Sequence, residues 1–460
     1  MSSLRSRFTR GGALASGLIC LAGITACGSD NDNTTPVKQP DPVIAPQPIA
    51  AASITTQPRT QAVQAGQPAT FSVVAAGTGT LAYQWWRNGV AIPGATSAIH
   101  TTQATTLADS GDVLSVVVRN DGGTSTSDAV ALQVEGIGAR VLAGGAVEPT
   151  RAQVDGVGKL ARFLNAGALA NDGAGNLLLV DTGVNSVRKI TPAGVVSTAI
   201  VGGTPAPALR TLRDVAAGAN GVRYVIDGAD GSPSTFVRKI GADGAVSTIE
   251  LGPTSGDPTG TNIAPPVFTA IASDVAGNLY VASEVTRPGE PECSSCFKRA
   301  IVRKVAADGT VTTVFENLGP HSASATITDL AVGKNGKLYV LDDRGIRTLD
   351  AAGVAVTLMD NTQAFITAIA VDTSGNLFFS TEPFSGRQSN WPAGAIGKIA
   401  ADGKLSVAAD PNGSDDRFTG AAGLEKPAGL ATGKPVGLAT DAAGALYVSA
   451  NGRVLKLVLP

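Results

Sequence analysis

The chain has 460 residues, a length that accommodates roughly two to four domains and a large hydrophobic core. Hydrophobic residues make up 43% of the chain and charged residues 16%, and the 56 glycines and few aromatic residues favour short strands joined by tight turns over helices. The formal net charge of −2 gives no electrostatic reason to expect nucleic acid as a partner.

The amino-terminal residues 1–26 have the pattern of a signal peptide that is not part of the fold. Arg5, Arg7 and Arg10 precede an apolar stretch that is too short for a membrane span. The stretch ends in Ile24-Thr25-Ala26-Cys27-Gly28, which resembles the lipobox of bacterial lipoproteins. The resemblance implies acylation of Cys27 and a membrane anchor. The alternative is an ordinary signal peptide with a chance cysteine.

Residues 27–51 are predicted to form the acylated Cys27 and a flexible tether. The segment is rich in Pro, Asp, Asn and Thr and cannot bury a core. Several acyl chains on one residue give stable anchoring where one would not. In lipoproteins an aspartate after the cysteine favours the inner membrane, and Gly28 stands there in this chain. The resemblance therefore implies the outer membrane.

Residues 52–135 alternate apolar and polar side chains in short runs, which predicts an antiparallel sandwich. The segment Tyr83-Gln84-Trp85-Trp86-Arg87-Asn88-Gly89 with Asp109-Ser110-Gly111 resembles a bacterial immunoglobulin-like domain. The resemblance implies that Trp85 is the core tryptophan and that Val73 and Val116 replace the two disulfide cysteines. Such modules are spacers or adhesive surfaces, and the spacer reading is favoured. An exposed Trp86 would serve the adhesive one.

Residues 139–460 repeat one unit six times, with a glycine turn before a strand such as Leu-Tyr-Val and a second strand after it. Such units must stack to bury their apolar faces. The first unit predicts strands over 168–170, 177–180, 187–190 and 195–198. The last unit ends after its third strand, and Arg140-Val141-Leu142-Ala143-Gly144 is predicted to supply the fourth and close a ring.

The segments Asp155 to Phe163 and Val187 to Gly194 closely resemble the NHL repeat family of six-bladed propellers. The resemblance implies an all-β fold in which an immunoglobulin-like sandwich precedes a six-bladed β-propeller. Members of that family are mostly binding scaffolds, and a few relatives of similar shape are enzymes. The repeats depart from the pattern at Thr348, which replaces a lysine, and at Gly397, which replaces an arginine.

Long insertions fall between the second and third strands and between the fourth strand and the next repeat, which places them on one face of a meander propeller. Long connections are commonly functional. This loop-rich face is the predicted binding face. Its candidate contact residues are Arg162, Phe163, Phe297, Trp391 and Phe418.

Acidic residues end the second strand of most repeats, namely Asp181, Asp227, Glu284, Asp342 and Glu382. One hypothesis is a Ca²⁺ site like that of lactonase-like propellers, because carboxylates suit this hard cation. The favoured interpretation is structural, with these carboxylates capping loop amides. No cofactor is otherwise expected.

Cys293-Ser294-Ser295-Cys296 lies in an insertion of the third repeat. A single pair lacks the second half of a structural zinc site, and no helix start is predicted that would lower a thiol pKa. A local disulfide that stiffens the loop is therefore predicted for Cys293 and Cys296.

Arg-Lys pairs recur in the third strands, at Arg188-Lys189, Arg238-Lys239 and Arg303-Lys304. Neighbours in a strand face opposite ways, so these pairs are not expected to form one basic surface. With only two histidines, no catalytic set is discernible. The predicted function is a lipid-anchored, non-catalytic scaffold that binds an envelope protein or glycan. The alternative is a Ca²⁺-dependent, lactonase-like hydrolase.

Overall fold

A computed structural model describes residues 49–136, 138–145, 152–201, 209–228, 235–251, 266–286, 298–317, 326–349, 354–360, 365–382, 391, 394–409 and 436–459. Within these residues the regular structure is strand apart from three short 3-10 helices: η1 (Leu107–Asp109), η2 (Gly158–Leu160) and η3 (Ala219–Gly221). The all-β class predicted from the many glycines and few charges is therefore observed.

The first ten strands, called here the N-terminal sheets, form three sheets that share one core. Two of them are the pairs β1 (Ser53–Thr56) with β4 (Val74–Ala76) and β3 (Thr70–Ser72) with β7 (Ile99–Thr101). The third has the order β2 (Gln61–Gln64), β10 (Val130–Glu135), β8 (Val113–Asn120), β5 (Ala82–Arg87), β6 (Val90–Ala91), with β9 (Gly123–Thr126) paired to β8. The core surrounds Trp85, which is fully buried and donates its Nε1 hydrogen to the Ser97 carbonyl at 2.9 Å. Val73 and Val116, the predicted replacements for a disulfide, are buried in the same core.

The remaining strands form six successive antiparallel sheets in the described residues, numbered here in chain order. Sheet 1 contains β12 (Gly156–Val157), β13 (Ala166–Asn171), β14 (Leu177–Asp181), β15 (Ser186–Ile190) and β16 (Val195–Val201); sheet 2 contains β17 (Thr211–Ala217), β18 (Arg223–Gly228), β19 (Thr235–Ile240) and β20 (Val246–Thr248); sheet 3 contains β21 (Val267–Ser273), β22 (Leu279–Thr286), β23 (Lys298–Val305) and β24 (Val311–Asn317). Sheet 4 contains β25 (Ile327–Val332), β26 (Leu338–Asp342), β27 (Gly345–Leu349) and β28 (Ala355–Asp360); sheet 5 contains β29 (Phe365–Val371), β30 (Leu377–Glu382), β31 (Ile396–Ile399) and β32 (Leu405–Ala409); sheet 6 contains β33 (Gly437–Thr440), β34 (Leu446–Ala450), β35 (Arg453–Val458) and β11 (Gly138–Ala143). The four strands predicted for the first repeat all lie in sheet 1.

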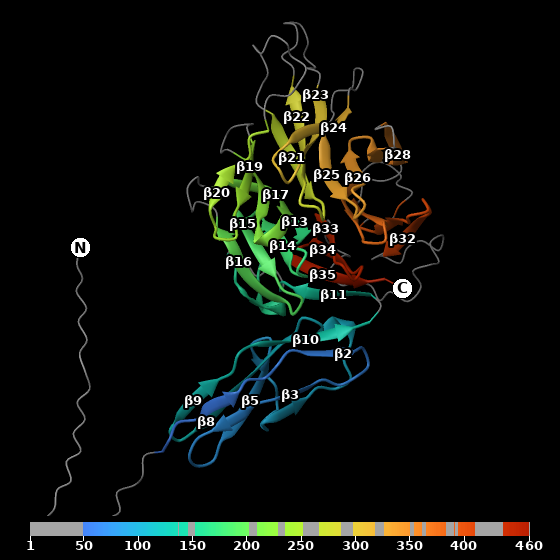
Figure 1. Ribbon diagram of the computed structural model, residues 1–460. Helices are drawn as coiled ribbons and strands as arrows, with labels where there is room; N and C mark the ends of the chain where they lie inside the picture. Colours follow the sequence, from blue (N-terminus) through green and yellow to red (C-terminus); the bar gives the residue numbers. More distant parts are fainter. Residues whose placement is uncertain are drawn as a thin grey trace, which may run out of the picture. The chain divides into compact units, whose positions relative to one another are not determined.

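These sheets form a closed ring, which is the arrangement of a β-propeller (Figure 1). The first strands contact one another in the order β13, β17, β21, β25, β29, β33, and β33 returns to β13. Sheet 6 is completed by β11, which pairs antiparallel with β35 from Gly138 opposite Val458 onward. The prediction that a strand before the first repeat completes the last sheet is confirmed.

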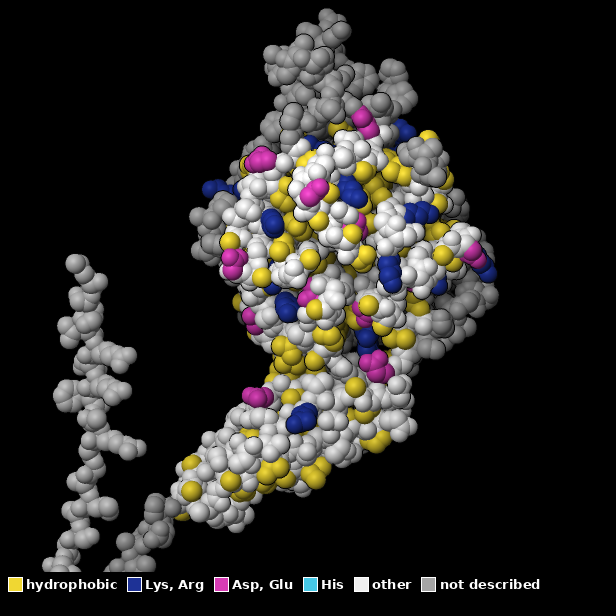
Figure 2. All heavy atoms as spheres, viewed as in Figure 1, with side chains coloured by type: hydrophobic (Ala, Val, Ile, Leu, Met, Phe, Trp, Pro, Cys, Tyr) yellow, Lys and Arg dark blue, Asp and Glu magenta, His cyan; other side chains and the backbone are white. Residues whose placement is uncertain are grey.

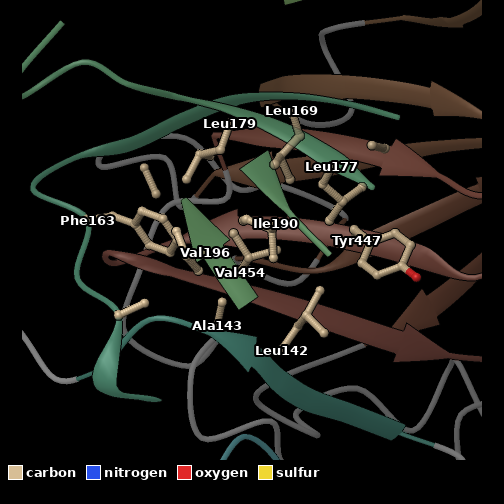
Figure 3. Close-up of a cluster of buried hydrophobic side chains, with 13 residues drawn as sticks. Leu142, Ala143, Phe163, Leu169, Leu177, Leu179, Ile190, Val196, Tyr447 and Val454 are labelled. Carbon is tan, nitrogen blue, oxygen red and sulfur yellow. The ribbon is translucent and has the colours of Figure 1, made fainter. Parts of the chain in front are cut away.

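An apolar cluster lies between each pair of neighbouring sheets in the described part of the ring. Second strands are buried on both faces, and all five residues of β14 are buried. Figure 3 shows the cluster at the seam, the name used here for the junction of sheets 6 and 1. There Leu142 and Ala143 of β11, Tyr447 of β34 and Val454 of β35 meet Leu177 and other side chains of sheet 1. The repeat therefore buries its apolar faces by stacking, as its sequence requires.

Candidate functional site

The acidic residues predicted at the ends of second strands occupy two different positions. Asp181, Asp227 and Asp342 pair with the first strand of their own sheet at one equivalent register. Glu284 and Glu382 lie one residue farther along, opposite Val267 and Phe365. In sheets 3 and 5 the equivalent register position holds Ser283 and Thr381. The five candidate acids therefore occupy two different register positions, one residue apart along the second strands.

Asp181 is fully buried and binds backbone amides. Its two carboxylate oxygens accept hydrogen bonds from the N–H groups of Leu164 and Asn165 at 2.9 and 2.8 Å. The Arg188 guanidinium, also fully buried, lies 3.8 Å from the same carboxylate. Arg188 further donates to the Val154 and Arg162 carbonyls and to Asp155. The carboxylate therefore caps the connection that enters β13, as the structural interpretation expects.

Asp227 and Asp342 have the same kind of environment in sheets 2 and 4. Asp227 accepts hydrogen bonds from the N–H groups of Arg210 and Thr211, and Arg238 lies 3.3 Å away. Asp342 accepts from the Arg344 N–H at 3.0 Å and forms an ion pair with Arg347. Glu284 accepts from the Thr326 hydroxyl at 3.0 Å. Within the described ranges no three His, Cys, Asp or Glu side chains gather as a metal site would require.

Two of the predicted binding-face residues are core residues, which corrects that part of the prediction. Phe163 is only 4% exposed and packs in the seam cluster, where Arg188 lies over its ring. Trp391 is 7% exposed, and its ring meets Phe379 edge to face at 5.0 Å between centroids. Both rings are large apolar groups whose burial stabilises the fold, so they are not surface contacts. Arg162 is half-buried, and its backbone pairs with Val154.

Five other candidate residues lie outside the described residues. These are Cys27, Cys293, Cys296, Phe297 and Phe418. The lipidation and the local disulfide accordingly stay predictions.

A feature that the sequence analysis missed is a β-bulge repeated in the first strands. The register shifts at the same place in β13, β17, β21, β25 and β29. Bulges re-aim side chains and are common beside functional sites. The extra residues are Gly167 in sheet 1, then Arg213, Thr269, Thr328 and Thr367. Because the first strands are innermost, these bulge residues surround the centre of the ring at the loop-rich end.

Four of the five bulge residues carry polar side chains. Arg213 and Thr328 are exposed, whereas Thr269 and Thr367 are half-buried. The Thr367 hydroxyl lies 2.7 Å from that of Ser380, and the Thr269 hydroxyl is buried with no hydrogen-bond partner among the described residues. One cation and a set of hydroxyls therefore lie at this end of the ring, a composition suited to a polar, oxygen-rich ligand.

Two carboxylates lie next to the bulges. Asp214 accepts from the N–H of Val215 in its own strand and from the N–H of Ile271 in sheet 3, both at 2.8 Å. Asp329 accepts in the same way from Leu330 and from Ile369 in sheet 5. Burial raises the pKa of Asp214 to about 6, and burial together with the Asp214 charge raises the pKa of Asp329 to about 8. Both side chains retain some accessible surface although they lie deep, as expected near the narrow centre of a ring.

Within the Arg-Lys pairs of the third strands, the arginine and the lysine face opposite sides of the sheet, as predicted. Arg188 and Arg303 are buried, whereas Lys189 and Lys304 are half-buried and reach outward. On the face shown in Figure 2, Lys and Arg side chains are interspersed with Asp and Glu rather than gathered into one basic area. No helix in the described residues has the length and apolar character needed to cross a membrane.

Comparison with known proteins gives remote structural likenesses. No family model matches the chain, and no curated protein matches it. A protein of unknown function from Bacteroides thetaiotaomicron aligns with 90% of this chain and 98% of its own, at 16% identity and a TM-score of 0.48. An auxiliary nutrient binding protein from the same organism aligns over 89% and 97% at 11% identity and a TM-score of 0.45. A putative gluconolactonase aligns over 70% and 91% at 14% identity and a TM-score of 0.42. At these scores none of the three transfers an activity to this chain.

Proposed function

We propose that the chain is an envelope lipoprotein whose six-bladed, NHL-type propeller binds a protein or glycan through its loop-rich face without catalysis. Each of the six sheets is taken as one blade, and the N-terminal sheets as an immunoglobulin-like domain. Acylation of Cys27 would anchor the chain to the outer membrane. The observation that carries the proposal is the ring of bulge residues, which presents Arg213 and Thr328 to solvent at the end where the long connections leave the sheets.

The alternative, a Ca²⁺-dependent lactonase-like hydrolase, is less well supported by the same region. The three buried acids at the second-strand ends already accept hydrogen bonds from backbone amides. Each also lies beside an arginine, so a cation would have to displace an existing positive partner. Ca²⁺ needs six to eight oxygen ligands, which these separated carboxylates do not supply together.

Binding is tested with the purified full chain and two probes, soluble peptidoglycan fragments and lipopolysaccharide-derived oligosaccharides. Arg213→Ala should weaken binding of a recognised probe by about tenfold, the effect of losing one hydrogen bond from a charged group, and Thr328→Val by less, because it removes a neutral hydrogen bond. The matched control is Lys404→Ala, an exposed cation in a turn at the opposite end of sheet 5. Equal weakening by the control and Arg213→Ala would contradict the assignment of the face.

If neither probe binds, crosslinking tests for a protein partner. A photoreactive residue is placed at position 213, and the matched position is 404.

Two further measurements separate the parts of the proposal. Membrane fractionation of Cys27→Ala should release the chain into the soluble fraction, and retention in the membrane would contradict lipid anchoring. Thermal unfolding with EDTA, followed by Ca²⁺ titration, addresses the alternative. A saturable rise in Tm would show Ca²⁺ binding to the folded chain and favour assays on lactones and esters.

A further inference from the structure

The N-terminal sheets meet the ring at the seam, where the first and last sheets join. Ile49–Pro460 forms one compact unit. Strand β11 follows β10 closely in the chain, and η1 contacts both strands. On the other side of the seam, η2 precedes β13 of sheet 1 and contacts β8 and β11. The N-terminal sheets therefore reach both partners of the junction that closes the ring.

Backbone atoms from three segments come close together at this point. Gly111, between η1 and β8, accepts a hydrogen bond from the Lys159 N–H at 2.8 Å. A Cβ atom added to Gly111 would lie 2.9 Å from the Val141 carbonyl oxygen of β11, and one added to Gly158 would lie 2.2 Å from the Gly111 oxygen. Both glycines have positive φ, +80° and +53°. The contact therefore requires glycine for space and for conformation.

A buried charge pair joins the same segments. Asp112 is 4% exposed, and its Oδ1 accepts hydrogen bonds from Lys159 Nζ at 2.7 Å and from Asn88 Nδ2 at 2.9 Å. Its other oxygen accepts from Arg87 Nε. Lys159 Nζ also donates to the Ala108 carbonyl at 2.6 Å. Because Asp112 is buried, loss of the lysine charge would leave its carboxylate with Arg87 as the remaining cationic partner, and this should cost more than the loss of an exposed ion pair.

Two further polar contacts flank this pair. Arg140 of β11 is 5% exposed, donates to the Val134 carbonyl at 2.9 Å and pairs with Glu135, so the closing strand is tied to the end of β10. Gln133 Nε2 donates to the Pro192 carbonyl at 2.7 Å, in the turn between β15 and β16 of sheet 1. One contact reaches sheet 6 and the other reaches sheet 1.

We propose that the N-terminal sheets act as a clamp across the seam, holding sheets 6 and 1 together through the surface formed by Gly111, Asp112 and Gln133. The ring has one junction that is closed by strands from distant parts of the chain, and the clamp binds both sides of it. The partner of this surface is the chain's own seam, with Lys159 and the Pro192 turn as its contacts. This role goes beyond that of a spacer and is independent of what the loop-rich face binds.

Hydrogen exchange of the full chain tests the clamp. Lys159→Met keeps the apolar stem and removes the charge, and it should raise the exchange rates of β11 and β35 amides by about tenfold. Rates in β22 of sheet 3, across the ring from the seam, should stay unchanged. Lys159→Arg, which can still pair with Asp112, should restore most of the protection. Lys189→Met, on β15 of the same sheet, is the matched control and should leave the seam unchanged.

Two results of this experiment would contradict the clamp. If Lys159→Met raises exchange only near Asn88 and Asp112 and leaves β35 protected, the contact is local and the clamp is wrong. A uniform rise over all six sheets would equally contradict it, because the effect would then be global. If Lys159→Met does not fold, Gln133→Ala removes a single flanking contact, and it should give the same seam-confined pattern with a smaller rise.

Discussion

Asp214 and Asp329 occupy equivalent positions in β17 and β25, and burial together with the negative charge of the first raises the pKa of the second. Each carboxylate joins its own sheet to the next by accepting one amide from each. Asp214 thus joins sheet 2 to sheet 3, and Asp329 joins sheet 4 to sheet 5. Burial outweighs the amide hydrogen bonds, which by themselves would lower both pKa values.

This pair predicts that the propeller is more stable in mild acid than in mild base. The folded pKa values, about 6 for Asp214 and about 8 for Asp329, exceed the ordinary value of 3.8. The folded chain then keeps protons that the unfolded chain has lost, and this stabilisation is fully present below about pH 4 and disappears as the pH rises through about 6 and 8. Calorimetry should show a Tm lower by about 5 °C at pH 8.5 than at pH 5.5.

Asp329→Asn should flatten that pH dependence, because the amide cannot ionise and retains one acceptor oxygen. Asp121→Asn, at an exposed position of the β8–β9 turn, serves as the control and should keep the slope of the unmodified chain. Asp109 and Asp155 have lowered pKa values, held down by hydrogen bonds and by their arginine partners against burial. Their contributions are lost below about pH 4, outside this window. An unchanged slope in Asp329→Asn would contradict the assignment.

Removal of the Asp181 carboxylate should destabilise the fold and leave the response to metal unchanged. Asp181→Ala leaves Arg188 buried without that partner and two amides without their acceptor, which costs about 3–5 kcal/mol. Urea unfolding measures the loss, and Asp181→Asn, which keeps one acceptor, should lose less. Thermal unfolding with added Ca²⁺ decides the role. A rise in Tm with Ca²⁺ that the unmodified chain shows and Asp181→Ala does not would identify Asp181 as a metal ligand.

The glycine that replaces the repeated arginine in sheet 5 makes room for Phe379. Phe379 pairs with Gly397 in the ladder, where the equivalent pairs are Leu179 with Arg188 and Val225 with Arg238. A Cβ atom at Gly397 would lie 2.0 Å from the Phe379 ring. Gly397→Ala should therefore destabilise the chain by about 1–3 kcal/mol through overpacking.

A second substitution checks this exchange of an arginine for an aromatic ring. Phe379→Leu combined with Gly397→Ala should be more stable than the sum of the two single variants predicts, because the smaller side chain relieves the clash. A double-mutant cycle by thermal unfolding measures the coupling. Strict additivity of the two free-energy changes would mean that the ring and position 397 do not compete for space.

Trp391 is expected to act in folding and not in recognition. Trp391→Ala removes a buried ring packed on Phe379, at a cost of about 3–5 kcal/mol in the free energy of unfolding. Binding of any glycan or protein partner, measured per folded molecule, should stay within twofold of the unmodified chain. Loss of binding with unchanged stability would return Trp391 to the predicted binding face.

The repeat pattern predicted the strands because period and turn chemistry act locally. Asp172 shows why: its carboxylate accepts the Ala174 and Asn176 amides, so five residues define the turn between β13 and β14. The closing role of β11 could also be inferred, since a repeat unit lacked one strand. The buried positions of Phe163 and Trp391 could not, because an aromatic residue within a long connection has no periodicity to show which way it faces.

Other features depend on contacts between distant segments. Asp214 and Asp329 follow polar residues in their strands, so the sequence does not mark them as buried, and one amide partner of each belongs to the following sheet. The five bulges each add one residue to a strand of six or seven residues, and in so short a run a single break in the alternation is not recognisable. The contact of Gly111 with Gly158 joins two turns, and turn glycines are too frequent in this chain to single them out.

The seam also sets the order in which this chain can finish folding. Ser449 donates a hydrogen bond to the Gly167 carbonyl, a partner 282 positions earlier in the sequence. Strand β11 is among the first parts of the ring to be synthesised, and its partner β35 is the last. Until β35 has been synthesised, β11 presents an unpaired strand edge, the kind of surface on which chains aggregate. A truncation that removes only β35 should therefore harm production of the protein far more than its length suggests.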